Sequence, residues 1–529
     1  MKQRSIKVSR SNLTLAELVL VARYDAQVEL APELYQDIDD SCAAVQKMVD
    51  ENAIVYGITT GFGSLASVAI SPEDTAALQE NLLKSHACGV GKPLSVAVVR
   101  AMLLLRVKSL SWGYSGIRRQ TIEALIAMLN AGLTPIVPEQ GSLGASGDLC
   151  PLAHMVLPLI GEGEAILDGE VLPGKLAMAR AGIATVKLTA KEGLALINGT
   201  QCMTAIGALT VADAQYLLTI AEITAALTLQ ALNGRRDAFS PLIHNLRPQA
   251  GQQISADLMM RHTEGSAFCA APQAGQANIR VQDAYSLRCI AQVHGASRDA
   301  IAYVRQIIET EMNSVTDNPL IFREGDGVQA ISGGNFHGQP VALAMDFLSI
   351  AVAELANIAE RRIERMVNKD LSNGLPAYLV NDTKAGLNSG LMILQYSAAA
   401  LVSENKVLAH PASVDSISSS NNQEDHVSMG TIAARQAAAI LENTQQVIAM
   451  ELLAATAAID LRCQKADWSK GQQLWLGPKP TIAGLSPTTK QVYDKVRQSV
   501  SFMTEDRIIA TDIKKVAQLI TNQELVAND

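Results

Sequence analysis

The segment Gly141–Asp148, with the sequence GSLGASGD, holds the residue types most suited to unusual chemistry in this chain. A nucleotide-binding loop is one interpretation of a Gly-rich segment, but neither G-x-G-x-x-G nor G-x-x-x-x-G-K-[ST] occurs in it. A plain helix-entry turn is another, with Asp148 as the N-cap and Pro151 tolerated in the first turn. Residue types alone do not decide between such a turn and a chemical role.

The triplet Ala145-Ser146-Gly147 has a chemical meaning of its own. In a tight bend the amide nitrogen of Gly147 can attack the carbonyl carbon of Ala145, because glycine has no side chain to block the approach. Loss of one water closes a five-membered ring, and loss of the Ser146 hydroxyl as a second water leaves an exocyclic methylidene. The product is an electrophile that no ordinary side chain supplies. A helix beginning near Asp148 would point its positive end at this ring.

Six segments, in order along nearly the whole chain, resemble the aromatic amino acid ammonia-lyase and aminomutase family. The loop Tyr56–Gly63 resembles the family's mobile catalytic loop, and the triplet segment resembles its cofactor-forming signature. The resemblance implies non-oxidative elimination of ammonia from an amino acid to give an arylacrylate. It also implies a 4-methylidene-imidazol-5-one formed autocatalytically from Ala145-Ser146-Gly147, with no external cofactor. The other four segments resemble further active-site segments of the family: Leu196–Gln201, Val281–Arg288, Gly333–His337 and Asn422–Met429.

The resemblance assigns roles to single residues. Tyr56 matches the base that removes the β-proton, which requires a phenol pKa below its usual value of about 10. Arg288 matches the binder of the substrate carboxylate, for which a guanidinium suits paired hydrogen bonds, and Asn198 and Tyr285 match residues that line the prosthetic group. Taken singly, each residue type is as well explained by packing, a helix-face amide or a surface ion pair. Two more match pocket residues that the family takes from neighbouring chains: Gln282 and Phe336.

Substrate choice is predicted from fewer residues. Ser85-His86 stands where the histidine branch of the family has Ser-His, whereas tyrosine and phenylalanine branches carry His-Leu or Phe-Leu. Burying imidazole nitrogens without partners costs about 1–3 kcal/mol, so we expect His86 and Glu424 to bind the substrate ring, or Glu424 to help as a base. Thr59 and Gly338 depart from the histidine branch, and Gly338 is similar to the other two branches. The expected reaction is conversion of L-histidine to trans-urocanate in histidine degradation, with a tyrosine or phenylalanine ammonia-lyase or aminomutase as the alternative.

Long helices are expected to position these segments. Ser297–Met312 carries apolar residues at spacings of three and four, and Val341–Val367 and Met429–Leu461 exceed the usual helix length of about 11–12 residues. The last is rich in alanine, whose small side chain lets helices approach closely. We predict a mostly α fold with a long central helical bundle of the ammonia-lyase and fumarase type and a smaller mixed N-terminal region.

Three zones follow from these patterns, with soft boundaries and no low-complexity linker between them. Residues 1–195 carry the tyrosine loop and the triplet, 196–462 carry the long helices, and 463–529 form a C-terminal helical layer. Strand signals are few, at Ser5–Ser9 and at Glu164–Leu172.

Composition narrows the class of protein. The 529 residues include 43 Lys and Arg against 52 Asp and Glu, a formal net charge of −9, which disfavours an indiscriminate nucleic-acid binder. Charged residues make up 18%, below a usual share of about 25%, so we expect large buried surfaces. The family resemblance implies a homotetramer whose active sites are shared between subunits, and large buried interfaces fit that assembly. No apolar run of about 18 residues occurs, so no membrane span is expected.

Cysteine and histidine spacing bears on metals and location. The seven cysteines and eight histidines show no zinc-ligand or H-E-x-x-H spacing, so no catalytic metal is expected. Unpatterned cysteines are typical of reduced thiols in a cytoplasmic protein. A catalytically silent helical scaffold remains a distant alternative, and the triplet argues against it because a scaffold has no need of that sequence.

Overall fold

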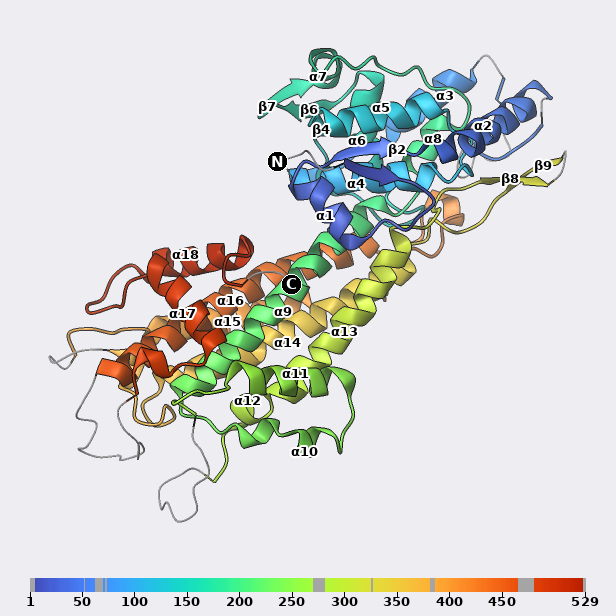
Figure 1. Ribbon diagram of the computed structural model, residues 1–529. Coiled ribbons are helices and arrows are strands. Elements are labelled where there is room, and N and C mark those ends of the chain that lie inside the picture. Colours follow the sequence, from blue (N-terminus) through green and yellow to red (C-terminus); the bar gives the residue numbers. More distant parts are fainter. Residues whose placement is uncertain are drawn as a thin grey trace. The chain divides into compact units, whose positions relative to one another are not determined.

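The structure is a computed structural model, and it is mostly α-helical (Figure 1), which confirms the predicted class. It divides into two compact units. Unit 1 comprises Met1–Ala212, Val304–Asp346 and Pro411–Gln436, and unit 2 comprises Asp213–Tyr303, Phe347–His410 and Ala437–Asp529. The three zones 1–195, 196–462 and 463–529 stay a prediction. The residues that the structure describes are 5–51, 53–61, 70–71, 74–269, 281–324, 327–380, 386–464 and 480–526.

Every strand of the described residues lies in unit 1, in four small sheets. The predicted strand pair at 164–172 is confirmed as a hairpin whose turn residues Asp168 and Gly169 both have positive φ. The first sheet pairs its strands in parallel and the other three are antiparallel. The sheets are β1 (Ser5–Val8) with β2 (Gln27–Leu30), β3 (Val90–Pro93) with β5 (Pro138–Gln140), β4 (Thr134–Pro135) with β6 (Glu164–Leu167) and β7 (Glu170–Pro173), and β8 (Leu320–Glu324) with β9 (Gly327–Ile331).

Helices of unit 1 enclose an aliphatic core around α4 (Val96–Leu110), which packs against α1 and α5. Ser95 caps α4 by accepting from the Val98 amide, and apolar side chains cover nearly all faces of this helix, which is why it is buried from Val99 to Leu110. The other helices wholly in unit 1 are α1 (Leu15–Arg23), α2 (Tyr35–Asp50), α3 (Thr75–His86), α5 (Arg119–Asn130), α6 (Leu149–Val156), α7 (Gly174–Arg180) and α8 (Glu192–Ile197).

Unit 2 is built from helices, several of them long. The predicted long helices are confirmed: α13, α14 and α16 cover the three segments that helical periodicity picked out. Most alanines of α16 are buried, as close helix packing requires. The helices that lie in unit 2, wholly or in large part, are α9 (Gln201–Ala231), α10 (Pro241–His244), α11 (Ala250–His262), α12 (Tyr285–Arg288), α13 (Ile290–Glu311), α14 (Gln339–Val367), α15 (Met392–Leu408), α16 (Gly430–Gln464), α17 (Pro487–Ser499) and α18 (Ile509–Thr521).

Buried polar contacts tie these long helices together within unit 2. Ser297 on α13 donates to the carbonyl of Ala351 on α14 at 2.8 Å. Arg362 on α14 binds Glu451 on α16 through two hydrogen bonds of 2.6 and 2.8 Å, and Thr228 on α9 donates to the same carboxylate at 2.7 Å. The predicted bundle is therefore present and is held by paired charges as well as by apolar packing.

Two helices, α9 and α14, are long and apolar enough to cross a membrane by length and composition alone. Of the most apolar 18-residue window in each, 78% and 67% of residues are buried inside the protein. Such burial is what the core helices of a bundle show.

Candidate active site

The triplet Ala145-Ser146-Gly147 lies in a bend between β5 and α6, in unit 1. Gly147 has φ +71°, and a Cβ atom placed on it would collide with the carbonyl of Gly199. The two glycines form a parallel bridge, and the Asp148 amide donates to the Gly199 carbonyl at 2.7 Å. Only glycine fits this close approach of two chain segments, which leaves the Gly147 amide unshielded by any side chain.

The Asp148 side chain holds the bend in place through buried hydrogen bonds. It occupies the N-cap position of α6, but its carboxylate makes no capping hydrogen bond to that helix. Instead it is fully buried and accepts from Ser142 at 2.8 Å, from the Met203 amide at 2.9 Å and from Thr431. Burial raises the pKa of Asp148, and these hydrogen bonds oppose the rise. The plain helix-entry turn therefore does not explain Asp148, because its side chain ties the bend to α9 and α16 instead.

Asn198 is the C-cap residue of the short buried helix α8, next to Gly199. Its side chain is 3% exposed, and its Oδ1 atom has no hydrogen-bond partner among the described residues. A buried amide oxygen without a partner costs about 1–3 kcal/mol. Gly199, the next residue, contacts Gly147 of the triplet. The Asn198 Oδ1 atom therefore belongs to a residue next to that contact, where a reacting group can donate a hydrogen bond to it.

Glu424 lies beside the triplet although it is 278 residues away in sequence. Its Oε1 atom accepts from the Ser146 hydroxyl at 3.2 Å, and its Oε2 atom accepts from Ser419 at 2.9 Å. Ser419 and Glu424 also form an isolated antiparallel bridge, which fixes the loop before α16. The carboxylate is thus held by the Ser419 hydroxyl of its own loop and binds the residue that must lose its hydroxyl.

His86, the last residue of α3, lies close enough to Glu424 for the two groups to interact electrostatically. Burial lowers the pKa of His86, opposed by its hydrogen bond to the Leu82 carbonyl and by the Glu424 carboxylate. The Nδ1 atom lies 2.9 Å from the Leu82 carbonyl oxygen. Because a carbonyl only accepts, Nδ1 carries the hydrogen, and the neutral ring presents a lone pair on Nε2.

Tyr56 is half-buried in a turn that runs from residue 56 to 59 in unit 1. The hydroxyl of Thr59 closes this turn: it donates to the Ala53 carbonyl at 2.5 Å and accepts from the Val55 amide at 3.0 Å. Thr59 therefore has a local structural role in the described part of the loop. The predicted loop residues Phe62 and Gly63 lie outside the described residues.

Phe336 is half-buried in the loop before α14, also in unit 1. The neighbouring His337 ring lies 5.7 Å from that of His426, so this loop and the Glu424 loop are adjacent. Gly338 is buried against Met203, and a Cβ atom at 338 would collide with the Met203 sulfur. The absence of a side chain at Gly338 thus makes room for a core methionine.

The structure places the three remaining predicted site residues in unit 2. Arg288 lies in α12 with its guanidinium over the Tyr285 ring, 4.8 Å from the ring centroid. Tyr285 is 72% exposed and Gln282 is also exposed, while the Nε atom of Arg288 is buried without a partner among the described residues. Within unit 2, the exposed Tyr285 ring and the unpartnered Arg288 nitrogen are therefore both available to bind another group.

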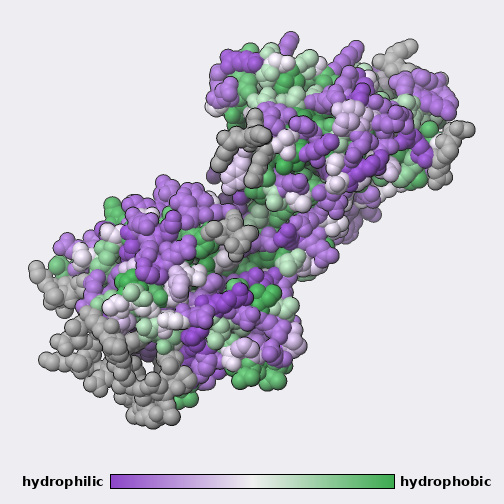
Figure 2. Space-filling view, in the orientation of Figure 1, coloured by the Kyte–Doolittle hydropathy of each residue, from purple (hydrophilic) through white to green (hydrophobic). Residues whose placement is uncertain are grey.

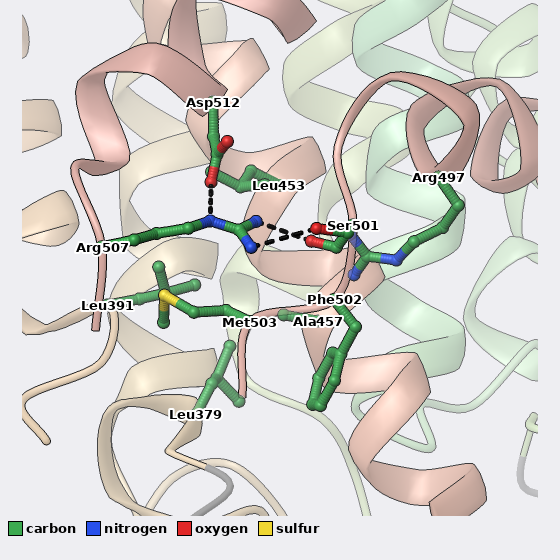
Figure 3. Close-up of a pocket in the computed structure, with 10 residues that line it drawn as sticks. All are labelled: Leu379, Leu391, Leu453, Ala457, Arg497, Ser501, Phe502, Met503, Arg507 and Asp512. Carbon is green, nitrogen blue, oxygen red and sulfur yellow. Dashed lines mark hydrogen bonds and ion pairs between the residues drawn. The ribbon is translucent and has the colours of Figure 1, made fainter. Parts of the chain in front are cut away.

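A cavity in unit 2 is lined by apolar side chains and two arginines, as the close-up in Figure 3 shows. Arg507 points across it and is bound to Asp512 at 2.8 Å and to the Ser501 carbonyl at 2.6 Å. None of the predicted site residues lines this cavity. Within the described ranges no group of three or more His, Cys, Asp or Glu is arranged to hold a metal ion.

Comparison with known proteins gives consistent matches. The aromatic amino acid lyase family model matches residues 13–498. The histidine ammonia-lyase of Symbiobacterium thermophilum is 56% identical, over 98% of this chain and 97% of its own length. That of Alkaliphilus metalliredigens is 53% identical, over 99% and 98%.

Solved structures match over the same extent. Histidine ammonia-lyase from Trypanosoma cruzi shares 40% identity with a TM-score of 0.87, covering 98% of this chain and 94% of its own. Tyrosine aminomutase from Streptomyces globisporus shares 37% identity with a TM-score of 0.90, covering 98% and 97%. Because these two scores are so close, backbone similarity does not separate the substrates, and side chains must do so.

Proposed function

The chain belongs to the aromatic amino acid lyase family, and we propose that it is an ammonia-lyase that converts L-histidine to trans-urocanate and ammonia. The observation that carries this conclusion is identity of 53–56% with histidine ammonia-lyases over nearly the full length of both chains. The site supports it, because a neutral His86 and the Glu424 carboxylate lie together at the triplet. The N–H of a substrate imidazole is a donor, and both His86 Nε2 and the Glu424 carboxylate offer an acceptor for it.

The triplet fits the prosthetic group that its sequence implies. Gly147 has the bend and the unshielded amide that cyclisation onto Ala145 needs, and the Ser146 hydroxyl, which must then be eliminated, is bound to Glu424. The unpartnered Oδ1 of Asn198 is an acceptor that a bound substrate amine can satisfy. When formed, the methylidene-imidazolone supplies an electrophile that makes the substrate amine a better leaving group.

The chain's own residues then bind the substrate and move its protons. Either His86 Nε2 or the Glu424 carboxylate accepts the ring N–H of histidine, or Glu424 helps as a base. Tyr56 removes the β-proton, a role that rests on its match to the family's loop tyrosine. Arg288 binds the carboxylate, with Tyr285 beside it. The match to the family assigns two further residues to the pocket, contributed by neighbouring subunits: Gln282 and Phe336.

A homotetramer with shared active sites is the assembly that the surface of unit 2 supports. Large apolar side chains stand exposed on its helices, and the surface in Figure 2 shows apolar residues among polar ones. Exposed apolar side chains at helical spacing are typical of subunit interfaces. Cytoplasmic location is proposed on the absence of patterned cysteines. The exposed side chains on the long helices of unit 2 are Tyr303, Phe347, Ile350, Ile393, Tyr396 and Val407.

The first test compares L-histidine, L-tyrosine and L-phenylalanine side by side in an ultraviolet assay of the purified protein, since each conjugated product absorbs differently. A rise with histidine alone is the expected result. A rise with tyrosine or phenylalanine instead would retain the reaction and refute the roles of His86 and Glu424. A β-amino acid product would identify an aminomutase, the reaction of a neighbour whose fold matches equally well.

Ser146→Ala tests the prosthetic group itself. The variant should fold, lose turnover by orders of magnitude, and have the intact mass calculated from its own sequence, whereas the wild-type chain should be lighter than its calculated mass by two water molecules. Full turnover in Ser146→Ala would refute the proposed electrophile.

A further inference from the structure

Helix α8 is short and buried, and it ends at Asn198, one of the predicted site residues. Asn198 is its C-cap, and Gly199 follows and touches Gly147. The last carbonyls of any helix lack partners within the helix. Whatever satisfies those of α8 therefore also fixes the turn that carries Asn198 and Gly199.

Arg106, from the middle of α4, supplies these partners. Its Nη1 donates to the Asn198 carbonyl at 2.9 Å and to Gln201 Oε1 at 2.7 Å, and its Nη2 donates to the Ala195 carbonyl. Gln201 is held in turn, because its Nε2 donates to Thr316 at 2.8 Å. One planar guanidinium thus spans the final turn of α8 and the first residue of α9.

This guanidinium is fully buried and its bonding partners are all neutral oxygens. Burial lowers the pKa of Arg106 to about 10, so it stays protonated at neutral pH. The nearest opposing charge is Asp317, which itself forms a buried ion pair with Lys191 at 2.6 Å. Breaking a hydrogen bond to a buried cation is costly, so the turn has little freedom to move away from Arg106.

The turn is closely surrounded by other groups. Gly199 has φ +154°, and a Cβ atom on it would lie 2.5 Å from Arg106 Nη1 and 2.7 Å from Thr316 Oγ1. On its other side, the Gly199 carbonyl accepts from the Asp148 amide. Arg106 therefore contacts the Asn198–Gly199 turn, and that turn contacts the bend that holds the triplet.

We propose that Arg106 is a positioning residue for the reaction: it holds the Asn198–Gly199 turn so that Asn198 Oδ1 and the Gly147 amide keep their reacting geometry. This inference rests on the proposed function and names a residue that touches neither substrate nor prosthetic group. Misplacing a reacting group by about 1 Å costs about 100-fold in rate. The lysine variant keeps the charge but loses the fork that reaches three oxygens at once.

Arg100 provides a matched control on the same helix. It is 4% exposed and donates to the Val21 and Leu129 carbonyls, both at 3.0 Å, and so it resembles Arg106 in burial and in bonding to backbone oxygens. None of these partners belongs to the site. If Arg106 were merely structural, Arg106→Lys and Arg100→Lys would behave alike.

The experiment compares the two lysine variants with the wild-type full chain. Arg106→Lys should lower kcat by about 100-fold with KM near the wild-type value, and a larger share of its chains should retain the two waters of the unmodified triplet. Arg100→Lys should lose thermal stability while keeping kcat and complete modification. Equal kcat and equal modification in the two variants would overturn the proposal.

A double-variant cycle identifies the residue through which Arg106 acts. In an Asn198→Ala background, Arg106→Lys should lower kcat far less than in the wild type, because the side chain that it positions is gone. Full additivity would overturn the proposal. If Arg106→Lys does not fold, Gln201→Met removes one of the three acceptors, and a kcat at the wild-type level in that variant would equally overturn it.

Failure of the proposed function gives a different result from failure of this inference. A wild-type protein inactive on histidine, tyrosine and phenylalanine would refute the proposed function. Triplet mass and amide hydrogen exchange at residues 198–200 would still report whether Arg106→Lys, unlike Arg100→Lys, loosens the turn. Unchanged exchange there would overturn the positioning role.

Discussion

Two buried arginines, one in each unit, are satisfied in different ways. In unit 2 the buried guanidinium of Arg362 faces the carboxylate of Glu451, and the pair joins two long helices. In unit 1 the buried guanidinium of Arg106 faces carbonyl and amide oxygens of a single turn, with its nearest carboxylate engaged by Lys191. The first arrangement neutralises charge between helices, whereas the second uses a charge to fix a stretch of backbone.

This difference matches the local architecture. Unit 1 contains every strand of the described residues, and its site is built on the close approach of the Gly147 and Gly199 backbones in two turns. The regular elements of unit 2 in its described part are helices, and buried side-chain pairs join the long ones. We therefore expect substitutions at the turns around the triplet in unit 1 to damage chemistry first, and substitutions at the buried pairs between the long helices of unit 2 to damage stability first.

Gly147→Ala should give the largest effect in this comparison. The methyl group would collide with the Gly199 carbonyl at φ +71°, which blocks the bend that cyclisation requires. Turnover should fall by orders of magnitude and the intact mass should retain both waters. Gly169→Ala is the control: its φ is +80° but nothing lies within 4 Å, so it should cost only about 1–2 kcal/mol of stability and no activity. Modification of the triplet in Gly147→Ala would contradict this account.

Glu451→Gln should lower the free energy of unfolding by about 3–5 kcal/mol, because it leaves the Arg362 cation buried without a counter-charge. The chains that remain folded should keep a fully modified triplet. Chemical denaturation measures the first effect and intact mass the second. Glu442→Gln, at an exposed position of the same helix, should change neither. A loss of modification without a loss of stability would break the proposed division between the units.

Gly338→Ala should have a smaller effect, of about 1–3 kcal/mol, since the added methyl displaces the flexible end of the Met203 side chain. Substrate preference should stay with histidine, because position 338 faces the core. Adding Met203→Ala should remove the collision and reduce the loss seen in thermal unfolding. A switch of preference to phenylalanine or tyrosine would show instead that Gly338 shapes the pocket.

Acidification should give the smallest of these effects, a loss of folding free energy that arises in unit 2. Burial and Arg261 lower the pKa of His262 from 6.5 to about 4. Below pH 6.5 the unfolded chain therefore binds a proton that the folded chain refuses, and stability falls as the pH drops toward 4. Between pH 7 and 5.5 the loss should be about 1 kcal/mol. Asp148 in unit 1, whose pKa burial raises, acts in the opposite direction. His262→Gln should flatten the decline measured by denaturation at each pH, and an unchanged slope would contradict the assignment.

Much of the fold was predictable from the sequence where the signal was local. The long helices follow apolar periodicity, and the β6–β7 hairpin follows from the Asp168-Gly169 turn. The β3–β5 pair was not predicted, because Val90–Pro93 contains glycine and proline and its partner lies almost 50 residues further along the chain. Pairing over such a distance leaves no periodic trace in either segment.

The site was predictable to a similar degree. The triplet and the family resemblance identified the side chains proposed to take part in the reaction. Arg106 was missed because most of its partners are backbone carbonyls, which every residue has and which a sequence therefore cannot single out. A charged residue inside the apolar run of α4 was the available signal. Thr59 and Gly338 attracted attention as departures in a substrate pocket, and the contacts explain them locally, by a turn and by a methionine.

The long separation between Ser146 and Glu424 has a consequence for biosynthesis. The groups that surround the triplet, including Thr431, lie about 280 residues nearer the C-terminus. During synthesis the triplet leaves the ribosome long before these partners exist, and contacts between such distant segments form late. Cyclisation therefore waits for an almost complete polypeptide, so truncated or stalled chains carry no electrophile, and the reactive group arises only inside the folded protein.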